Sequence, residues 1–335
     1  MLTFTLRRLL LAIPTLLVIS LVIFLLVDLA PGSPMSEIPL TVPPDVRQKM
    51  IEALGADQPV FFRYLLWLRQ FFWVEPMTLF DGWAGTHVVE GEQRILSWQS
   101  RSPVFTIIGQ RLPQTLTVIG TAYLVGILIA LPIGIYSAYR QYSFFDQGGT
   151  LFAMLGFSVP TFFSGTLFII IFAVWLGWFP TKYDTQLVVH DWDSFLKQVK
   201  QMALPVMTLG LANAAAISRY MRSSMLDNMT QDYVRTARAK GMTERTVVLK
   251  HVLRNSLIPV ITVIALGIPS IFGGAIITEN LFGVNGIGAA LIGAIHANDI
   301  PMVQTLAFIF AVLIVLFNLI ADILYGFLDP RIRYD

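Results

Sequence analysis

The chain alternates between long apolar stretches and shorter charged segments. Six stretches contain no Asp, Glu, Lys or Arg: 9–27, 112–139, 147–181, 201–218, 255–278 and 300–321. A helix needs about 20 mostly apolar residues to cross a hydrocarbon core about 30 Å thick. In that core each backbone amide must be satisfied within its own segment, which favours helices, and the period of two typical of barrel strands is missing. The pattern therefore predicts an all-α integral membrane protein with six transmembrane helices.

The segment 30–111, between the first two stretches, predicts short helices outside the membrane. One helix is expected to start at Pro44 and to stop at Gly55. A second helical pattern opens at Pro59 and is rich in aromatic residues with a few arginines. This composition is typical of a helix lying at the membrane surface, but a small external domain with its own aromatic core fits equally well. Residues 81–103 have no strong period and predict a loop.

Composition excludes an ordinary soluble domain. Hydrophobic residues make up 55% and charged residues 13% of the chain, whereas soluble domains carry about 25% charged residues. The net charge of +2 is too small to indicate nucleic-acid binding. Cysteine is absent, so disulfides, thiolate metal sites and a cysteine nucleophile are excluded.

Loop charges predict the orientation. Arg7 and Arg8 precede the first stretch, a larger basic group follows the fourth, and the predicted loop 179–200 balances its lysines with aspartates. Cytoplasmic loops carry the excess of Lys and Arg, so both termini are expected in the cytoplasm. A secretory signal peptide would also start with basic residues, but the uncharged run 9–27 exceeds the usual apolar region of about 7–15 residues. A poor cleavage site at 28–32 also favours a retained first helix.

The sequence has no recognisable catalytic set. It lacks the phosphate-cradling Gly-x-x-x-x-Gly-Lys-Ser/Thr loop, His-Glu-x-x-His and Gly-x-Ser-x-Gly. Its 4 histidines have no metal-ligand spacing. We therefore expect no enzyme activity, no metal and no cofactor in this chain.

Charged residues near the spans are few. Arg219 and Arg222 lie one turn apart at the inner end of the fourth span, and we interpret them as interfacial anchors in preference to pathway residues. Asn318 and Asp322 lie on one face of the last helix, where we expect them to fix helix packing. A proton relay would need more buried carboxylates, so a proton-coupled carrier is disfavoured.

The inner segment 223–255 is long compared with the other inner loops. Residues 232–240 can form a short helix, Gly241 can end it, and Thr243 can cap a second helix with Glu244 in its first turn. Small residues that admit a partner surface are Thr236, Ala237 and Ala239, and the basic residues around them are Arg235, Arg238, Lys240 and Arg245. The pattern is that of a docking knob, or equally of an ordinary basic amphipathic helix at the membrane surface.

The residues 233–241 and 251–259 resemble the coupling segment of ABC importer permeases. The likeness is closest to the dipeptide/oligopeptide/nickel permease family. The general signature is Glu-Ala-Ala, three residues, Gly, nine residues and Ile-x-Leu-Pro. Ala237 and Gly241 match it, whereas Arg235 stands at the Glu position.

The resemblance covers nearly the whole chain. Further matching segments are 7–9 with 14–15, 30–34, 54–59, 111–116, 278–282 and 328–331. His251 and Arg254 replace the Ile and Pro of the general signature, as the peptide branch commonly does. Residues 83–101 look longer than usual, and Asn285 and Asn298 replace a usual Pro and Arg. These departures are expected on the outside, where they concern contacts with an external receptor or with the substrate.

The resemblance implies a type I ABC importer permease fold. Its expected divisions are an N-terminal transmembrane helix (1–29), an external segment (30–111), a permease core of five transmembrane helices (112–328) and a cytoplasmic tail (329–335). The coupling segment is 223–255 within that core. The residues expected to dock into an ATPase groove are Tyr233, Arg235, Thr236, Ala237, Arg238, Ala239, Lys240, Gly241 and Arg245.

The implied partners are a paralogous second permease, two ABC ATPase subunits that bind ATP and Mg²⁺, an extracytoplasmic binding protein and membrane lipid. The implied location is the inner membrane of a bacterium or archaeon. Di- or oligopeptides are the expected cargo, with nickel complexes, glutathione and oligosaccharides as alternatives. A secondary carrier is the main rival from another class, although internal repeats are not clear, and a membrane enzyme comes third.

Overall fold

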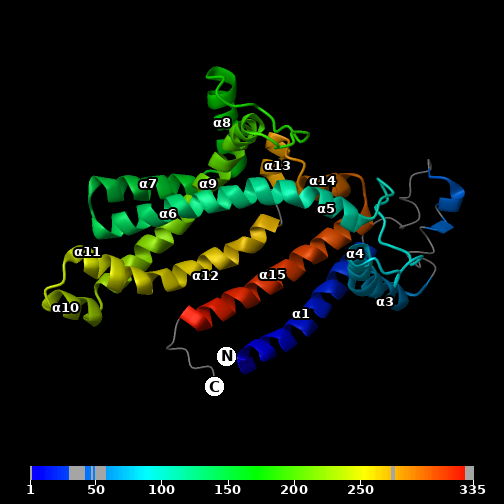
Figure 1. Ribbon diagram of the computed structural model, residues 1–335, viewed down its shortest axis with the longest axis horizontal. Coiled ribbons are helices and arrows are strands. Elements are labelled where there is room, and N and C mark those ends of the chain that lie inside the picture. Colours follow the sequence, from blue (N-terminus) through cyan, green and yellow to red (C-terminus); the bar gives the residue numbers. More distant parts are fainter. Residues whose placement is uncertain (1, 30–41, 47, 50–57, 273–275, 329–335) are drawn as a thin grey trace. The chain divides into compact units, whose positions relative to one another are not determined.

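The computed structural model describes residues 2–29, 42–46, 48–49, 58–272 and 276–328. Helices dominate these residues (Figure 1), which confirms the predicted all-α class. The predicted helix from Pro44 is helical at 44–46 and 48–49, whereas its predicted stop at Gly55 and the tail 329–335 lie outside the described residues.

The helices follow one another with few long connections. Those of the first half are α1 (Leu2–Asp28), α3 (Val60–Arg69), α4 (Glu75–Ala84), α5 (Val104–Thr115), α6 (Thr121–Tyr139), α7 (Phe144–Ser158) and α8 (Thr161–Phe168). Those of the second half are α9 (Trp192–Met229), α10 (Asp232–Ala239), α11 (Glu244–Thr246), α12 (Leu253–Phe272), α13 (Ile276–Phe282), α14 (Ile287–His296) and α15 (Ile300–Leu328). Wider π-helical turns adjoin some of them: η1 (Gln70–Val74), η2 (Leu116–Gly120), η3 (Ile169–Trp175) and η4 (Val247–Val252).

Five continuous helical stretches among the described residues are long and apolar enough to cross a membrane. They are Thr5–Asp28, Val104–Tyr139, Trp192–Met229, Glu244–Pro269 and Ile300–Ile323. The remaining predicted stretch, 147–181, is broken, because the chain bends by 105° between Phe144–Ser158 and Thr161–Trp175. Val159 is extended there (φ −85°, ψ 123°), as expected for a residue before Pro160. A second pair, α13 and α14, bends by 92°, so the count of six spans stays a prediction.

The chain divides into two compact units. Unit 1 comprises Met1–Leu9, Pro113–Ala289 and Leu316–Asp335. Unit 2 comprises Leu10–Leu112 and Ala290–Val315. The division passes through α1, α5, α14 and α15, so single helices contribute to both units.

Unit 1 is built on the close packing of α6 against α9, with α7 beside both (Figure 1). Glycines on α6 make this approach possible. A Cβ on Gly126 would lie 2.8 Å from the Cβ of Asn213, and one on Gly134 would lie 2.6 Å from the Cβ of Met221. Small residues allow such backbone contact in lipid, where dispersion rather than water exclusion drives helix association.

Helix α9 is longer than the sequence predicted. It begins at Trp192, so the predicted loop 179–200 was wrong in its second half. A capping box explains the start: Oδ1 of Asp191 accepts from the Ser194 N–H at 2.7 Å, and Oγ of Ser194 accepts from the Asp191 N–H at 3.0 Å. These reciprocal bonds satisfy backbone donors that would otherwise be unpaired at the helix start.

Unit 2 holds an aromatic core. Tyr64 and Trp67 of α3 and Phe71 of η1 are buried. Ring centroids lie 5.4 Å apart between Tyr64 and Phe24 of α1, and 4.8 Å apart between Phe71 and Phe308 of α15. The aromatic core is therefore confirmed, whereas the position of this segment at the membrane surface stays a prediction, which the exposed aromatic side chains on α3–α4 are consistent with.

Buried carboxylates in unit 2 hold the loop that follows α4. Asp299 is 2% exposed and accepts hydrogen bonds from the hydroxyl of Ser97 and from the Trp98 N–H at 3.0 Å. Glu75 is 0% exposed and accepts from Nη2 of Arg94 at 2.7 Å. Since α4 ends at Ala84, the loop predicted for 81–103 is confirmed from residue 85 onward.

Candidate functional site

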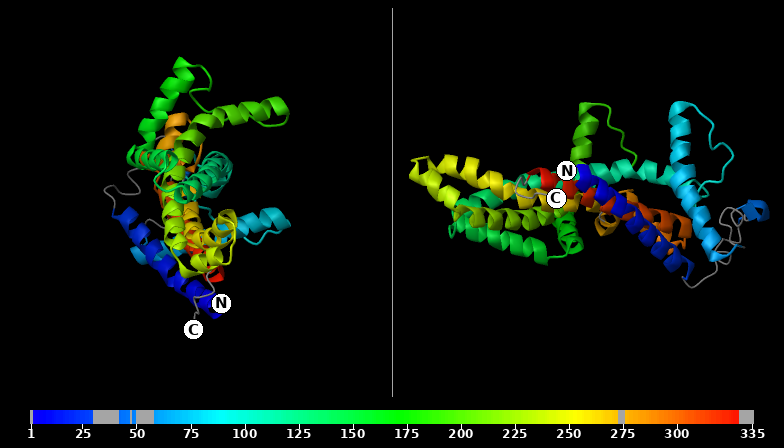
Figure 2. Two further views of the ribbon diagram at one scale, coloured as in Figure 1. Left: turned by 90° about the vertical axis from the view of Figure 1, so that its left-hand side faces the viewer. Right: turned by 90° about the horizontal axis from the view of Figure 1, so that it is seen from below.

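The segment from α10 to η4 forms a compact helical hairpin at one end of unit 1 (Figures 1 and 2). Helix α10 covers the residues predicted for it, and Gly241 follows with φ +75°. Only glycine adopts this left-handed conformation without strain, and the Gly241 N–H donates to the carbonyl of Arg238 at 2.9 Å. The predicted helix and its glycine stop are confirmed.

An ion pair closes the hairpin. Nη2 and Nε of Arg238 donate to the Glu244 carboxylate at 2.6 and 3.1 Å. The hydrogen bond that Arg238 donates to the Glu244 carboxylate raises the pKa of Arg238 above its ordinary value. Thr243 stands at the predicted cap position of α11, but its hydroxyl pairs with the hydroxyl of Thr246 at 2.9 Å and makes no capping bond to the backbone. The predicted side-chain cap was therefore wrong.

The inner face of the hairpin packs into the apolar core of unit 1. Val234 is 0% and Ala237 5% exposed, and both join a cluster with residues of α6, α9 and η4. Ala237 was predicted to admit a partner, but the structure turns it inward. Its small side chain lets α10 lie close to the chain's own core, and this corrects that interpretation.

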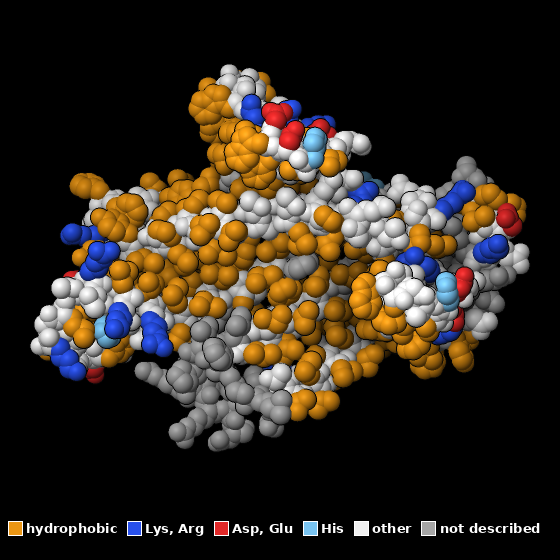
Figure 3. Space-filling model, in the orientation of Figure 1, with side chains coloured by type: hydrophobic (Ala, Val, Ile, Leu, Met, Phe, Trp, Pro, Cys, Tyr) orange, Lys and Arg blue, Asp and Glu red, His pale blue; other side chains and the backbone are white. Residues whose placement is uncertain are grey.

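The outer face of α10 is exposed and basic. Arg235, Thr236, Ala239 and Lys240 are all exposed, and a Cβ on Gly241 would meet nothing within 4 Å. Figure 3 shows Lys and Arg side chains gathered over this end of unit 1, next to apolar surface. Tyr233 is half-buried, and its hydroxyl donates to Oδ1 of Asn228 at 2.6 Å, which ties α10 to the end of α9.

Arg245 does not share the outer face of α10. It lines a cavity of about 290 Å³ together with Tyr136 and Tyr139 of α6 and Leu249 of η4. The basic residues predicted to surround the small residues of α10 therefore lie on two surfaces. Arg235 and Lys240 lie on the outer face of α10, and Arg245 lines this cavity.

Arg222 is not a simple interfacial anchor. Its Nε and Nη2 donate to the two carboxylate oxygens of Asp146 at 2.5 and 2.8 Å. The Asp146 side chain is 3% exposed, so this two-point ion pair joins the start of α7 to α9 inside unit 1. Neighbouring Arg219 is exposed and lies 4.8 Å above the ring of Phe157. The interpretation of Arg222 as an interfacial anchor was therefore wrong. The sequence did not show the ion pair because Asp146 lies 76 positions away from Arg222.

Asp322 of α15 pairs with the N-terminal helix. Its Oδ2 lies 2.7 Å from Nη1 of Arg8, in the part of α1 that belongs to unit 1. Asn318 lies one turn earlier and is exposed. A packing role for Asn318 therefore has no support from burial.

A buried network at the second helix break was not predicted from the sequence. Glu279 of α13 is 0% exposed, and its Oε1 accepts from the hydroxyl of Thr115 at 2.8 Å. The same hydroxyl accepts from the Ile287 N–H at 2.8 Å, and Oε2 of Glu279 accepts from the Ala289 N–H at 2.9 Å. A carboxylate of α13 thus caps the first turn of α14, where partial positive charge favours an anion.

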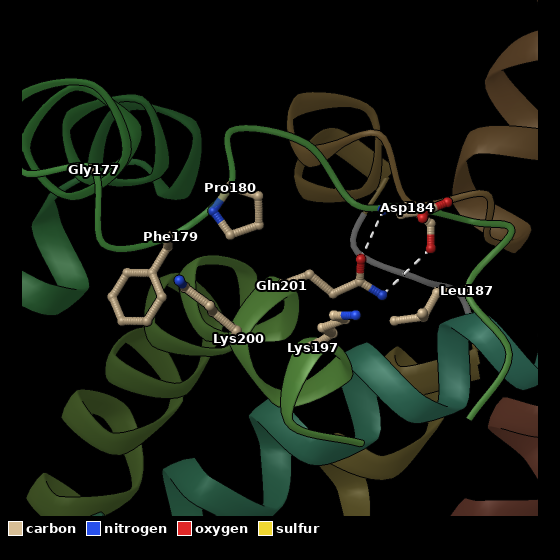
Figure 4. Close-up of a pocket in the computed structure, with 8 residues that line it drawn as sticks. All are labelled: Gly177, Phe179, Pro180, Asp184, Leu187, Lys197, Lys200 and Gln201. Atoms are coloured by element: carbon tan, nitrogen blue, oxygen red, sulfur yellow. Dashed lines mark hydrogen bonds between the residues drawn. The ribbon is translucent and has the colours of Figure 1, made fainter. Parts of the chain in front are cut away.

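A shallow cavity of about 420 Å³ lies at the start of α9 (Figure 4). Gln201 lines this cavity and holds the loop in place, because its Oε1 accepts from the Asp184 N–H at 2.8 Å. Lys197 pairs with Asp193 at 2.6 Å. Within the described residues no group of three His, Asp or Glu could hold a metal ion.

The arrangement is that of a helical membrane unit with a rigid basic hairpin at one end. Residues 130–334 match the family described as "Binding-protein-dependent transport system inner membrane component", and residues 1–119 match the corresponding N-terminal family. The chain belongs to this family. It is the membrane-embedded permease of an ABC importer, and ATP hydrolysis in this family lies in separate subunits.

Members of this binding-protein-dependent permease family resemble the chain over its full length. It is 37% identical to the oligopeptide transport system permease protein AppB of Bacillus subtilis (strain 168), over 100% of both chains. It is 36% identical to the glutathione transport system permease protein GsiC of Salmonella paratyphi A, again over 100% of both. A putative peptide transport system permease of Brucella abortus (strain 2308) is 35% identical over 98% of both chains.

Proposed function

We propose that this permease forms part of the pathway for short peptides, which a binding protein delivers from outside the membrane. The observation that carries the proposal is the full-length likeness to permeases named for oligopeptide, glutathione and peptide transport. Glutathione is itself a small peptide, so the cargoes named for these relatives share peptide chemistry.

The proposed assembly contains a paralogous second permease chain and two ATPase subunits that bind ATP and Mg²⁺. The exposed face of α10 at Arg235, Thr236, Ala239 and Lys240 rests in a groove of one ATPase. Closure of the ATPase pair draws the hairpins together and turns the membrane helices outward. The internal packing of Ala237 and the Arg238–Glu244 ion pair support this role, because a hairpin that transmits movement must be rigid.

The proposed location is a bacterial or archaeal inner membrane, with both termini in the cytoplasm. The basic hairpin and the N-terminal arginines would then share the cytoplasmic side, as loop charge predicts. The Arg8–Asp322 ion pair supports this arrangement, since it joins the first turns of α1 to the end of α15.

Uptake of labelled peptides tests the proposed cargo. Cells that carry the transporter with its binding protein should accumulate labelled di- to hexapeptides, and cells that lack this chain should not. Uptake of an unrelated sugar serves as the control for membrane energy. Loss of the chain without any effect on peptide uptake would contradict the proposed cargo.

Glutathione is the second candidate cargo, because a glutathione permease is similar over the whole chain. Competition distinguishes the two cargoes. If the binding protein selects ordinary peptides, excess unlabelled tetrapeptide should abolish uptake of labelled tetrapeptide, and excess glutathione should leave it unchanged. Uptake of labelled glutathione that excess tetrapeptide does not reduce would favour glutathione as the cargo.

A further inference from the structure

An apolar groove lies between the end of α6 and the α11–η4 part of the hairpin, and it encloses about 290 Å³. Its walls are Ile135, Tyr136, Tyr139, Arg245, Val248 and Leu249. Tyr136 and Leu249 are each 47% exposed, so the groove is open to its surroundings. Arg245 is the one charged side chain among these lining residues. The groove therefore offers a long apolar surface with a cation on it.

The groove lies where a membrane helix leaves the bilayer. Helix α6 belongs to the apolar stretch Val104–Tyr139 and ends at Tyr139, directly before Arg140. Tyrosine and arginine at a span end mark the boundary between hydrocarbon and headgroups. The guanidinium of Arg140 lies 5.4 Å from the ring centroid of Tyr139, so a second cation stands beside the groove. An amphiphile bound there would place its tail in hydrocarbon and its head beside two arginines.

The charge around the groove is positive. Arg140, Arg245 and Lys250 are all exposed at this end of unit 1. Two carboxylates in the neighbouring elements α11 and α7 are neutralised by other partners. Glu244 pairs with Arg238 at 2.6 Å, and buried Asp146 pairs with Arg222. This positive charge favours a headgroup with a net negative charge over a cationic or net-neutral one.

We propose that this groove binds one anionic phospholipid of the inner leaflet. Its acyl chain lies along Ile135, Val248 and Leu249, and its phosphate lies between Arg140 and Arg245. Basic pockets between membrane helices on the cytoplasmic side are suited to anionic headgroups. The lipid joins α6 to the coupling hairpin and so stiffens the hairpin's base. This lipid site goes beyond the proposed transport function. Its assignment to the inner leaflet rests on the proposed orientation, in which the hairpin is cytoplasmic.

Native mass spectrometry of the purified transporter tests the site, after delipidation and addition of phosphatidylglycerol or phosphatidylcholine. Wild type should retain phosphatidylglycerol in preference. Each removed cation should weaken retention about fivefold, so Arg140→Ala with Arg245→Ala should weaken it about 25-fold. Leu249→Trp should also reduce retention, because the larger ring fills the groove. Arg219→Ala, an equal charge loss at an exposed site on α9, should change nothing.

Three results would overturn the site. They are equal retention of the two lipids, unchanged retention in the double arginine variant, and an equal loss in Arg219→Ala, which would show general charge attraction. Intact assembly with the ATPases in all variants separates failure of the lipid site from failure of the proposed transport function.

Crosslinking identifies the occupant directly. The chain contains 0 cysteines, so Leu249→Cys creates a single attachment point for a photoactivatable maleimide. In native membranes, the illuminated chain should gain the mass of an anionic phospholipid. An adduct with the second permease or an ATPase subunit would show that protein covers the groove and would overturn the proposal.

Discussion

The buried carboxylate of Glu279 joins elements that meet at a helix break, and its removal should destabilise unit 1. Its two oxygens each receive a donor: the Thr115 hydroxyl at 2.8 Å and the Ala289 N–H at 2.9 Å. The Thr115 hydroxyl is itself occupied as an acceptor by the Ile287 N–H. Both oxygens of residue 279 must therefore act as acceptors. The side chain that best suits this position is a carboxylate.

Glu279→Gln preserves shape and tests this requirement. A glutamine offers one acceptor oxygen, so its NH₂ group must face either the Thr115 hydroxyl or the Ala289 N–H. One buried donor then loses its partner, which costs about 1–3 kcal/mol, and the bond that remains is no longer charge-assisted. We expect a total loss of about 2–4 kcal/mol in the free energy of unfolding. Glu279→Ala should cost more, because it removes both bonds and leaves a cavity.

The assay is equilibrium unfolding of the purified chain from lipid–detergent micelles by increasing SDS. Thr115→Val removes the bridging hydroxyl and should cost about 1–3 kcal/mol. Its matched control is Thr117→Val, because the Thr117 hydroxyl is exposed and bonds only within its own turn, to the Pro113 carbonyl at 2.7 Å. That control should stay within about 0.5 kcal/mol of wild type.

Glycine substitutions test the same network from its other side. A Cβ on Gly288 would lie 2.9 Å from Oε2 of Glu279, whereas one on Gly293, later in α14, would meet nothing within 4 Å. Gly288→Ala should destabilise the chain, and Gly293→Ala should be neutral or slightly stabilising. If Glu279→Gln and Gly288→Ala both unfold like wild type, the reasoning about this cap is refuted.

Three further predictions concern other contacts. Gly241→Pro and Ala237→Arg should abolish uptake and uncouple ATP hydrolysis from transport without blocking membrane insertion, because proline cannot adopt φ +75° and arginine cannot enter a 5% exposed site, so either change distorts the hairpin. Normal uptake in either variant would contradict the coupling role of the hairpin. Asp146→Ala should lower the free energy of unfolding in SDS by about 3–5 kcal/mol, because it leaves Arg222 unpaired. The double variant Asp146→Ala with Arg222→Ala should lose less, and a double variant less stable than the single one would contradict the ion-pair account. Asp299→Asn should expose residues 85–103 to faster limited proteolysis, whereas an unchanged cleavage rate would show that this carboxylate does not hold the loop.

Local features were predictable from the sequence because their causes are local. The apolar stretches, the helix at α10 and the stop at Gly241 depend on residues within a few positions of one another. The early start of α9 was also readable in principle, since Asp191 and Ser194 have capping-box spacing. The sharp bend before Pro160 was not predicted, because the pattern of 147–181 indicated one continuous span.

Contacts between distant residues were not predictable from one sequence. Arg222 and Asp146 are 76 positions apart, and Thr115 and Glu279 are 164 apart. Glu279 belongs to a segment that resembles the family, but the sequence did not indicate its role. Its burial depends on the bend between α13 and α14. Ala237 was assigned to a partner for the same reason, since its inward direction depends on the packing of α10 against η4.

The central claim is that this chain transmits work from separate ATPases and moves no cargo alone. Reconstitution into liposomes tests it directly, with the second permease, binding protein and labelled peptide present throughout. Uptake should require both the ATPase subunits and ATP, and should disappear when either is omitted. Accumulation of peptide without ATPase subunits, driven by an imposed ion gradient, would contradict the claim.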